Sequence, residues 1–171
     1  MKKTTSDLLK SLKSSPSVDR YLKENQNELF FDSAADLIEY YLITKKLKKA
    51  EVIERSHMDR TYAYQIMKGT KLNPGRDKLI MLCYGLTLNV EETNRVLKMS
   101  GYPELYPRNL RDVVIIRGII ERKSILDVDI KLYEMGLELF LKPKDKNEEA
   151  EEKTEKSKKK KQKQKKQSKK E

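Results

Sequence analysis

A stretch near the middle of the chain, residues 59–68, gathers side chains that suit the recognition of DNA bases. Arg60 and Gln65 carry forked hydrogen-bonding groups that match the edges of guanine and adenine, respectively, in the major groove. In a helix, successive side chains advance by about 100°, so the polar and apolar residues of this stretch separate onto two faces. One face carries Thr61, Gln65 and Lys68, with Arg60 and Tyr64 beside it, and the other carries Ala63, Ile66 and Met67. Such a helix can pack on a core with one face and enter a groove with the other.

The segments on either side supply groups that suit the phosphate backbone of DNA. Lys49 begins the preceding amphipathic pattern, where free backbone amides and an ammonium group can both meet a phosphate. Lys68, Lys71 and Asn73 flank the other end and suit the backbone of the opposite strand. The sequence therefore predicts base contacts at the centre of one helix and phosphate contacts around it.

Two short amphipathic patterns must position these groups. The first predicts a helix over residues 49–55 that buries Ala50, Val52 and Ile53, and a tight turn follows at Ser56-His57-Met58. Asp59 can cap the second helix by accepting from its first free amides, and Gly69 is a natural end for it.

Helices are predicted along the rest of the body as well, so the expected fold class is all-α. Capping residues mark their starts at Ser6, Ser17, Ser33 with Asp36, Asn89 with Glu92, and Ser124 with Asp127. Inward stripes are expected from Leu37, Tyr40, Tyr41, Ile43, Thr44 and Leu47, and from Leu79, Ile80, Leu82, Cys83 and Leu86. The apolar run within residues 111–121 is too short to distinguish a helix from a buried strand. We interpret it as a helix because its neighbours are helical and no partner strand is visible.

The segment Leu47–Met99 resembles the phage-repressor/Cro-type (XRE) family of helix-turn-helix proteins. The resemblance rests on the order of a helix, KAEVIERS, a turn, a helix that ends in Gly69, an Asn73-Pro74 loop and a leucine-rich helix. It covers about a third of the chain and extends more weakly to LTLNVEETNRVLKMSGY. With the GYPELYPRN loop and the last helical pair included, the body also resembles Firmicute regulators of this type. The resemblance implies a five-helix, DNA-binding fold.

The resemblance also implies a role for each matching position. Lys49 takes a phosphate-contacting place where the family usually has Gln, and Tyr62 takes a place that meets the sugar-phosphate backbone. The expected base-reading residues are Arg60, Thr61 and Gln65, and the expected backbone contacts are Lys49, Tyr62, Tyr64, Lys68, Lys71 and Asn73. One of the two tyrosines is expected to pack on the core instead. His57 replaces the usual turn Gly, which often needs a left-handed backbone, and Met67 replaces a common Glu.

The chain divides into four expected parts. Residues 1–31 form accessory helices, 32–101 the helix-turn-helix domain, 102–141 a helical pair packed on it, and 142–171 a lysine-rich tail. The tail has 14 Lys and 7 acidic residues, and so supplies most of the chain's formal net charge of +11. Because it has no hydrophobic residue beyond Ala150, we expect it to be disordered. Its charge would attract polyanions and add salt-sensitive, non-specific affinity for DNA.

The remaining composition argues against an enzyme and against a bound metal or cofactor. The single His, His57, lies in a turn, and the single Cys, Cys83, lies on a predicted core stripe, so a Cys–His dyad has little support and a zinc site cannot form. No glycine-rich phosphate loop occurs. No apolar run approaches the ~20 residues of a membrane span, and no signal-peptide pattern opens the sequence. We therefore expect a cytoplasmic protein with no membrane partner.

These features predict a bacterial transcriptional regulator that reads double-stranded DNA in the major groove. One module offers a small interface, so tight binding is expected to need a homodimer on two half-sites. Residues 111–136 are the candidate segment for dimerisation or for a protein partner, with Arg111, Arg117 and Arg122 expected as surface charges. Two alternatives stay open: a protein-interaction adaptor on the same fold that does not read DNA, and an RNA-binding protein led by its lysine tail.

Overall fold

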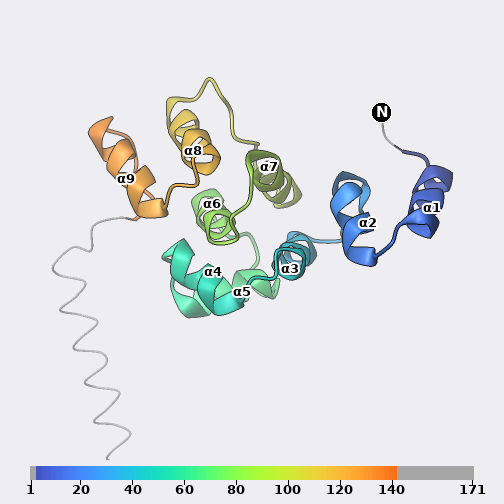
Figure 1. Ribbon diagram of the computed structural model, residues 1–171. Coiled ribbons are helices and arrows are strands. Elements are labelled where there is room, and N and C mark those ends of the chain that lie inside the picture. Colours follow the sequence, from blue (N-terminus) through green and yellow to red (C-terminus); the bar gives the residue numbers. More distant parts are fainter. Residues whose placement is uncertain (1–2, 142–171) are drawn as a thin grey trace, which may run out of the picture. The chain divides into compact units, whose positions relative to one another are not determined.

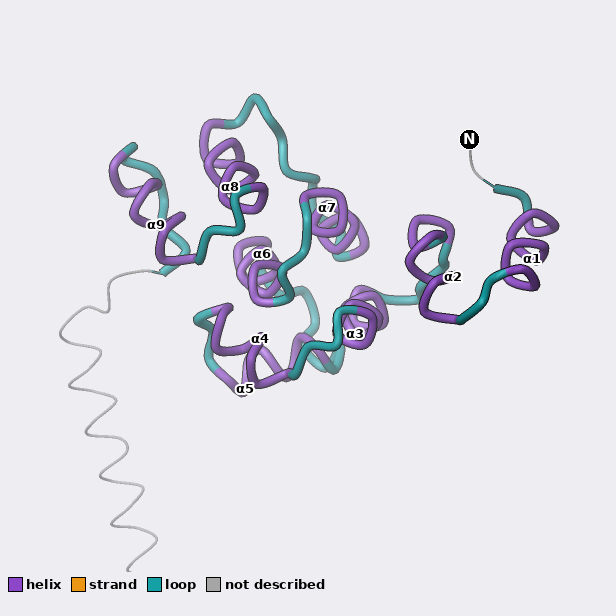
Figure 2. Tube along the Cα trace, viewed as in Figure 1, coloured by secondary structure: helices purple, strands orange, loops and turns teal. Residues whose placement is uncertain are grey.

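The computed structural model describes residues 3–141, and all regular structure in that range is helical (Figure 2). In chain order the elements are α1 (Thr5–Ser14), α2 (Val18–Glu24), the short 3-10 helix η1 (Gln26–Glu28), α3 (Ala34–Thr44), α4 (Lys49–Ser56), α5 (Arg60–Met67), α6 (Arg76–Gly85), α7 (Val90–Met99), α8 (Leu110–Ile120) and α9 (Ile125–Glu134). The all-α prediction is confirmed, including the helix within residues 111–121. The predicted disorder of residues 142–171 lies outside the described residues. No helix in the described range is long and apolar enough to cross a membrane.

Most helices begin where a capping side chain satisfies an early backbone amide. All of the predicted caps but one accept a hydrogen bond from the backbone N–H three positions ahead. These caps are Ser17, Ser33, Asp59, Asn89 and Ser124. Asn89 and Ser124 form full capping boxes, because Glu92 and Asp127 accept in turn from the cap amide. The prediction of Ser6 as the first cap is wrong, since α1 starts after Thr4, whose hydroxyl accepts from the Asp7 amide.

The core is built around α6 (Figure 1). Helices α4 and α7 pack on α6, and α3 contacts both α5 and α7. The buried residues of α6 are Leu79, Ile80, Met81, Leu82, Cys83 and Gly85, and those of α3 are Leu37, Ile38, Tyr41 and Leu42. The predicted inward positions of Ile43, Thr44 and Ala50 are wrong, because all three residues are exposed. In α3 the apolar residues cover more than one side, so periodicity alone does not fix the buried side.

Close packing of α4 on α6 depends on Gly85. A Cβ atom at this position would lie 2.3 Å from the carbonyl oxygen of Val52 and 3.1 Å from the Cβ atom of Ser56. Ser56 is fully buried, and its hydroxyl donates to the carbonyl oxygen of Ile53 at 2.9 Å. The missing side chain at Gly85 therefore sets the position of the last turn of α4, from which the chain continues to α5.

Two reciprocal Arg–Asp pairs tie the start of α8 to the start of α6. Arg76 donates to both carboxylate oxygens of Asp112, at 3.0 and 2.9 Å, and Arg111 donates to both carboxylate oxygens of Asp77, at 2.9 and 2.8 Å. Bidentate pairs restrict orientation as well as distance. The expectation that Arg111 is a surface charge is wrong, because its side chain is only 17% exposed.

The N-terminal helices α1 and α2 contact each other, and neither contains a buried residue. Arg95 on α7 connects the segment that follows them to the core. Its guanidinium group donates to the carbonyl oxygens of Gln26 and Leu29 and lies 5.0 Å from the centre of the Phe31 ring. The residues up to Phe140 form one unit by their contacts.

Candidate nucleic-acid interface

Helix α5 separates its side chains into a buried face and an exposed face, as its periodicity predicts. The buried residues are Ala63, Ile66 and Met67. The residues opposite them, all exposed, are Thr61, Gln65 and Lys68. At about 100° per residue, these three lie within about 60° of one another around the helix axis. The polar face of α5 is therefore open to solvent over its full length.

Cation–aromatic pairs border this face on both sides. Arg60 is exposed and lies about 140° from Gln65 around the axis, at one edge of the face. Its guanidinium carbon is 5.8 Å from the centre of the Tyr64 ring, and the Lys71 Nζ atom is 5.3 Å from the centre of the Tyr62 ring. Both tyrosines are half-buried, so neither ring lies wholly in the core. Each ring instead supports a cation beside the exposed face.

The turn before α5 has the left-handed residue typical of a tight helix–turn–helix connection. His57 adopts φ 52° and ψ 28°, a conformation that Gly adopts freely and that His tolerates at some cost. Asp59 then caps α5 by accepting from the Tyr62 amide at 2.9 Å. His57 therefore adopts the left-handed conformation that the resemblance leads us to expect at this turn.

Lys49, an expected phosphate contact, is already paired within the chain. Its ammonium group lies 2.8 Å from the carboxylate of Glu39 on α3, and the two side chains are 36% and 45% exposed. A pair this exposed contributes at most about 1 kcal/mol, so a phosphate could displace Glu39. The first amides of α4 are also not capped by a side chain, because the N-cap residue is Lys48. Sequence reasoning missed the Glu39 contact, since no local pattern connects two different helices.

The loop after α5 presents a hydrophobic side chain that sequence reasoning also missed. Leu72 is 80% exposed and stands between Lys71 and Asn73, which are exposed as well. The amides of Thr70 and Lys71 both donate to the carbonyl oxygen of Gln65 at 3.0 Å, which holds the loop at the end of α5. An apolar side chain here could contact a thymine methyl group. An isolated Leu in a polar loop, outside any periodic stripe, is the sequence signal for it.

The single Cys and the single His of the chain lie in different surroundings within residues 3–141. Cys83 is buried, and burial raises the pKa of its thiol to about 12, which disfavours the reactive thiolate. His57 lies at the surface, in the turn before α5. Between residues 3 and 141, no three His, Cys, Asp or Glu side chains gather into a group that could hold a metal ion.

Comparison with known proteins gives no matching family model, no matching curated protein and no matching solved structure.

Proposed function

We propose that this chain is a sequence-specific DNA-binding protein that regulates transcription in the bacterial cytoplasm, with α5 as its recognition helix. The observation that carries the proposal is the solvent-exposed polar face of α5, which lies opposite the three residues that anchor the helix in the core. A helix anchored on one side and polar on the other can enter the major groove without rearrangement.

The residues around this face divide into base-reading and positioning roles. Gln65 and Thr61, near the centre of the exposed face, read bases, and Arg60 reads from its edge. Positioning on the phosphates falls to a ring of donors around α5: Lys49, Tyr62, Tyr64, Lys68, Lys71 and Asn73. Tyr64 and Tyr62 each hold a cation at the border of the face, Arg60 and Lys71 respectively.

Selection from random DNA duplexes tests the proposal directly. The full chain should enrich a defined sequence. On that sequence, Gln65→Ala should weaken binding by about 1–3 kcal/mol and relax the preference at one base pair, with little effect on unrelated duplexes. Arg60→Ala should behave similarly, whereas Arg20→Ala, which removes the same charge from exposed α2, should not. An equal loss on every duplex would contradict base reading by Gln65.

A protein-interaction adaptor is the second candidate, and one observation favours it. Lys49 already pairs with Glu39, and Arg60 already lies on Tyr64, so two of the cations near α5 have partners within the chain. An adaptor would enrich no DNA sequence in the selection.

The RNA-binding alternative depends on the lysine-rich residues 142–171. Deletion of these residues separates the alternatives. A DNA reader should lose mainly its non-specific, salt-sensitive affinity, and a binder led by the tail should lose nearly all of its affinity.

A further inference from the structure

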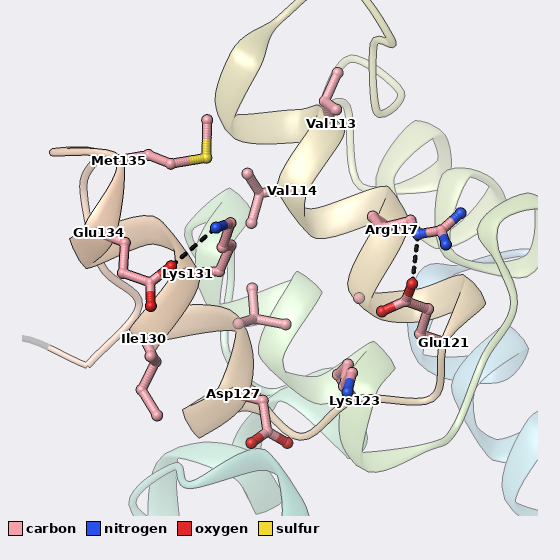
Figure 3. Close-up of a pocket in the computed structure, with 12 residues that line it drawn as sticks. Val113, Val114, Arg117, Glu121, Lys123, Asp127, Ile130, Lys131, Glu134 and Met135 are labelled. Carbon is pink, nitrogen blue, oxygen red and sulfur yellow. Dashed lines mark hydrogen bonds and ion pairs between the residues drawn. The ribbon is translucent and has the colours of Figure 1, made fainter.

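Leu72, in the loop between α5 and α6, is an exposed apolar side chain at the end of the proposed recognition helix. It is 80% exposed, and its neighbours Lys71 and Asn73 are polar and exposed. On α8 and α9, by contrast, exposed apolar side chains such as Val113 and Ile130 line a common groove of about 450 Å³ (Figure 3). A single exposed leucine is common on protein surfaces, so the position of Leu72 decides what it can contact.

Three hydrogen bonds fix the loop on the last turn of α5. The amides of Thr70 and Lys71 each donate to the Gln65 carbonyl oxygen at 3.0 Å, and the Thr70 hydroxyl donates to the same atom at 3.2 Å. The Lys71 side chain lies against α5, because its Nζ atom is 5.3 Å from the centre of the Tyr62 ring. Standard bond lengths then place the Leu72 Cα atom within roughly 8 Å of the Gln65 carbonyl oxygen. Leu72 is therefore held close to the central residue of the exposed face.

We propose that Leu72 reads the C5 methyl group of a thymine at the edge of the DNA site that α5 recognises. This inference rests on the proposed function and adds a specificity-determining residue to it. The loop is continuous with the proposed interface, so the DNA bound by α5 is also what covers Leu72. Phosphate oxygens offer an isobutyl group no favourable contact, whereas the thymine methyl group is an apolar group on a base edge in the major groove.

The hydrogen bonds to Gln65 also set where this thymine lies. Successive base pairs are 3.4 Å apart along the duplex, so a reach of roughly 8 Å spans between two and three of them. The thymine should therefore lie within about three base pairs of the base pair that Gln65 reads.

An apolar wedge between base pairs is the other role that an exposed leucine can have on DNA. Such wedges enter the minor groove and unstack the bases there. The loop of Leu72 is fixed instead to the helix that enters the major groove, through the carbonyl oxygen of Gln65. A wedge would also not depend on the thymine methyl group, which can be removed from the DNA alone.

Replacement of thymine by uracil tests the contact, because it removes the methyl group and keeps the base pairing. The duplexes carry the sequence that the full chain enriches, with one thymine at a time replaced by uracil. At one thymine within the expected range, uracil should weaken wild-type binding about 4-fold, which corresponds to about 0.8 kcal/mol for one buried methyl group. Leu72→Ala should weaken binding to the thymine duplex by at least the same factor. In this variant uracil should then change the affinity by less than about 1.5-fold, because the two changes remove one contact.

Leu9→Ala is the matched control, because Leu9 on α1 is also exposed, at 51%, and lies outside the ring of donors around α5. This variant should keep the wild-type affinity and the full effect of uracil. If Leu72→Ala weakens the thymine and uracil duplexes equally, or weakens neither, Leu72 does not read the methyl group. An enriched sequence with no thymine in the expected range, or with no effect of uracil there, overturns the inference as well.

The enrichment itself tests the proposed function separately. If no sequence is enriched, both the proposed function and the Leu72 contact are refuted. If a sequence is enriched and Gln65→Ala relaxes its preference at one base pair, but uracil has no effect that depends on Leu72, only the Leu72 contact is refuted.

Discussion

Replacement of Gly85 by Ala tests how the recognition helix is positioned. A Cβ atom there would lie 2.3 Å from the Val52 carbonyl oxygen, and real Cβ contacts essentially never fall below 3.0 Å. The obstacle is backbone, so it cannot rotate away, and α4 must move outward by at least the difference of 0.7 Å between these two distances. Overpacking of this kind costs about 1–3 kcal/mol. Ala recovers up to about 1 kcal/mol through its higher helix propensity. Because a main-chain atom is the obstacle, we expect the overpacking cost to lie near the upper end of its range, which leaves a net loss of stability of about 2 kcal/mol.

Urea denaturation of the full chain measures this loss, and Gly75→Ala provides the control. No atom lies within 4 Å of a Cβ atom at Gly75, so this variant should stay within about 0.5 kcal/mol of the wild type. Gly85→Ala should also weaken specific DNA binding, because a displaced α4 shifts the turn that leads into α5 while leaving the surface of α5 unchanged. A Gly85→Ala variant that unfolds at the wild-type urea concentration would refute the account of α4 packing.

Three further stability predictions follow from buried polar groups. Arg76→Ala should lower the free energy of unfolding by about 2–4 kcal/mol in urea denaturation, because the Asp112 carboxylate, which is 8% exposed, then loses its bidentate partner. The control Arg117→Ala breaks only a surface pair with Glu121 and should lower the free energy of unfolding by less than about 0.5 kcal/mol. Tyr84→Phe should cost about 1 kcal/mol, because the Tyr84 hydroxyl donates to the Ile115 carbonyl oxygen at 2.7 Å. Burial raises the pKa of Cys83, Tyr41 and Tyr84 in the folded chain. As pH rises, the unfolded chain therefore loses these protons before the folded chain does. The free energy of unfolding should then fall above pH 9.0, the ordinary pKa of a thiol. Urea denaturation from pH 7.5 to 10.5 measures this fall. In Cys83→Ala the fall should begin only near pH 10.0, the ordinary pKa of tyrosine. If the fall begins at the same pH in Cys83→Ala as in the wild type, it does not come from the thiol.

Local signals explain why the caps and the faces of α5 are predictable from sequence. A cap such as Asp59 or Asn89 involves residues only three positions apart, and the polar and apolar residues of α5 separate cleanly. In α3, by contrast, Ile43 is exposed whereas Ile38, which lies outside the predicted stripe, is buried. The contacts of α3 with α5 and α7 decide which side turns inward, and no local pattern contains them.

The sequence pattern predicts which residues belong to the candidate interface, but it does not predict their ion pairs with other helices. Lys49 lies on a different helix from Glu39, and Arg111 lies 34 positions from Asp77 along the chain. Such pairs depend on how helices are placed, which the packing at positions such as Gly85 decides. The Arg60–Tyr64 contact is the exception, because residues four apart on one helix are neighbours, and the sequence pattern already contains that pair.

The position of α5 depends on energy supplied by other helices. A helix of eight residues is not stable alone in water, and α5 contributes only three buried side chains of its own. Its contact with α3, the packing of α4 on α6 and the capped turn before it therefore determine where its polar face points. The same α6 holds α8 through the two Arg–Asp pairs at its first residues. Helix α6 thus determines the placement of α5, through α4, and also the placement of α8. Loss of Arg76 or Asp77 should therefore destabilise the fold without changing which bases the recognition helix reads.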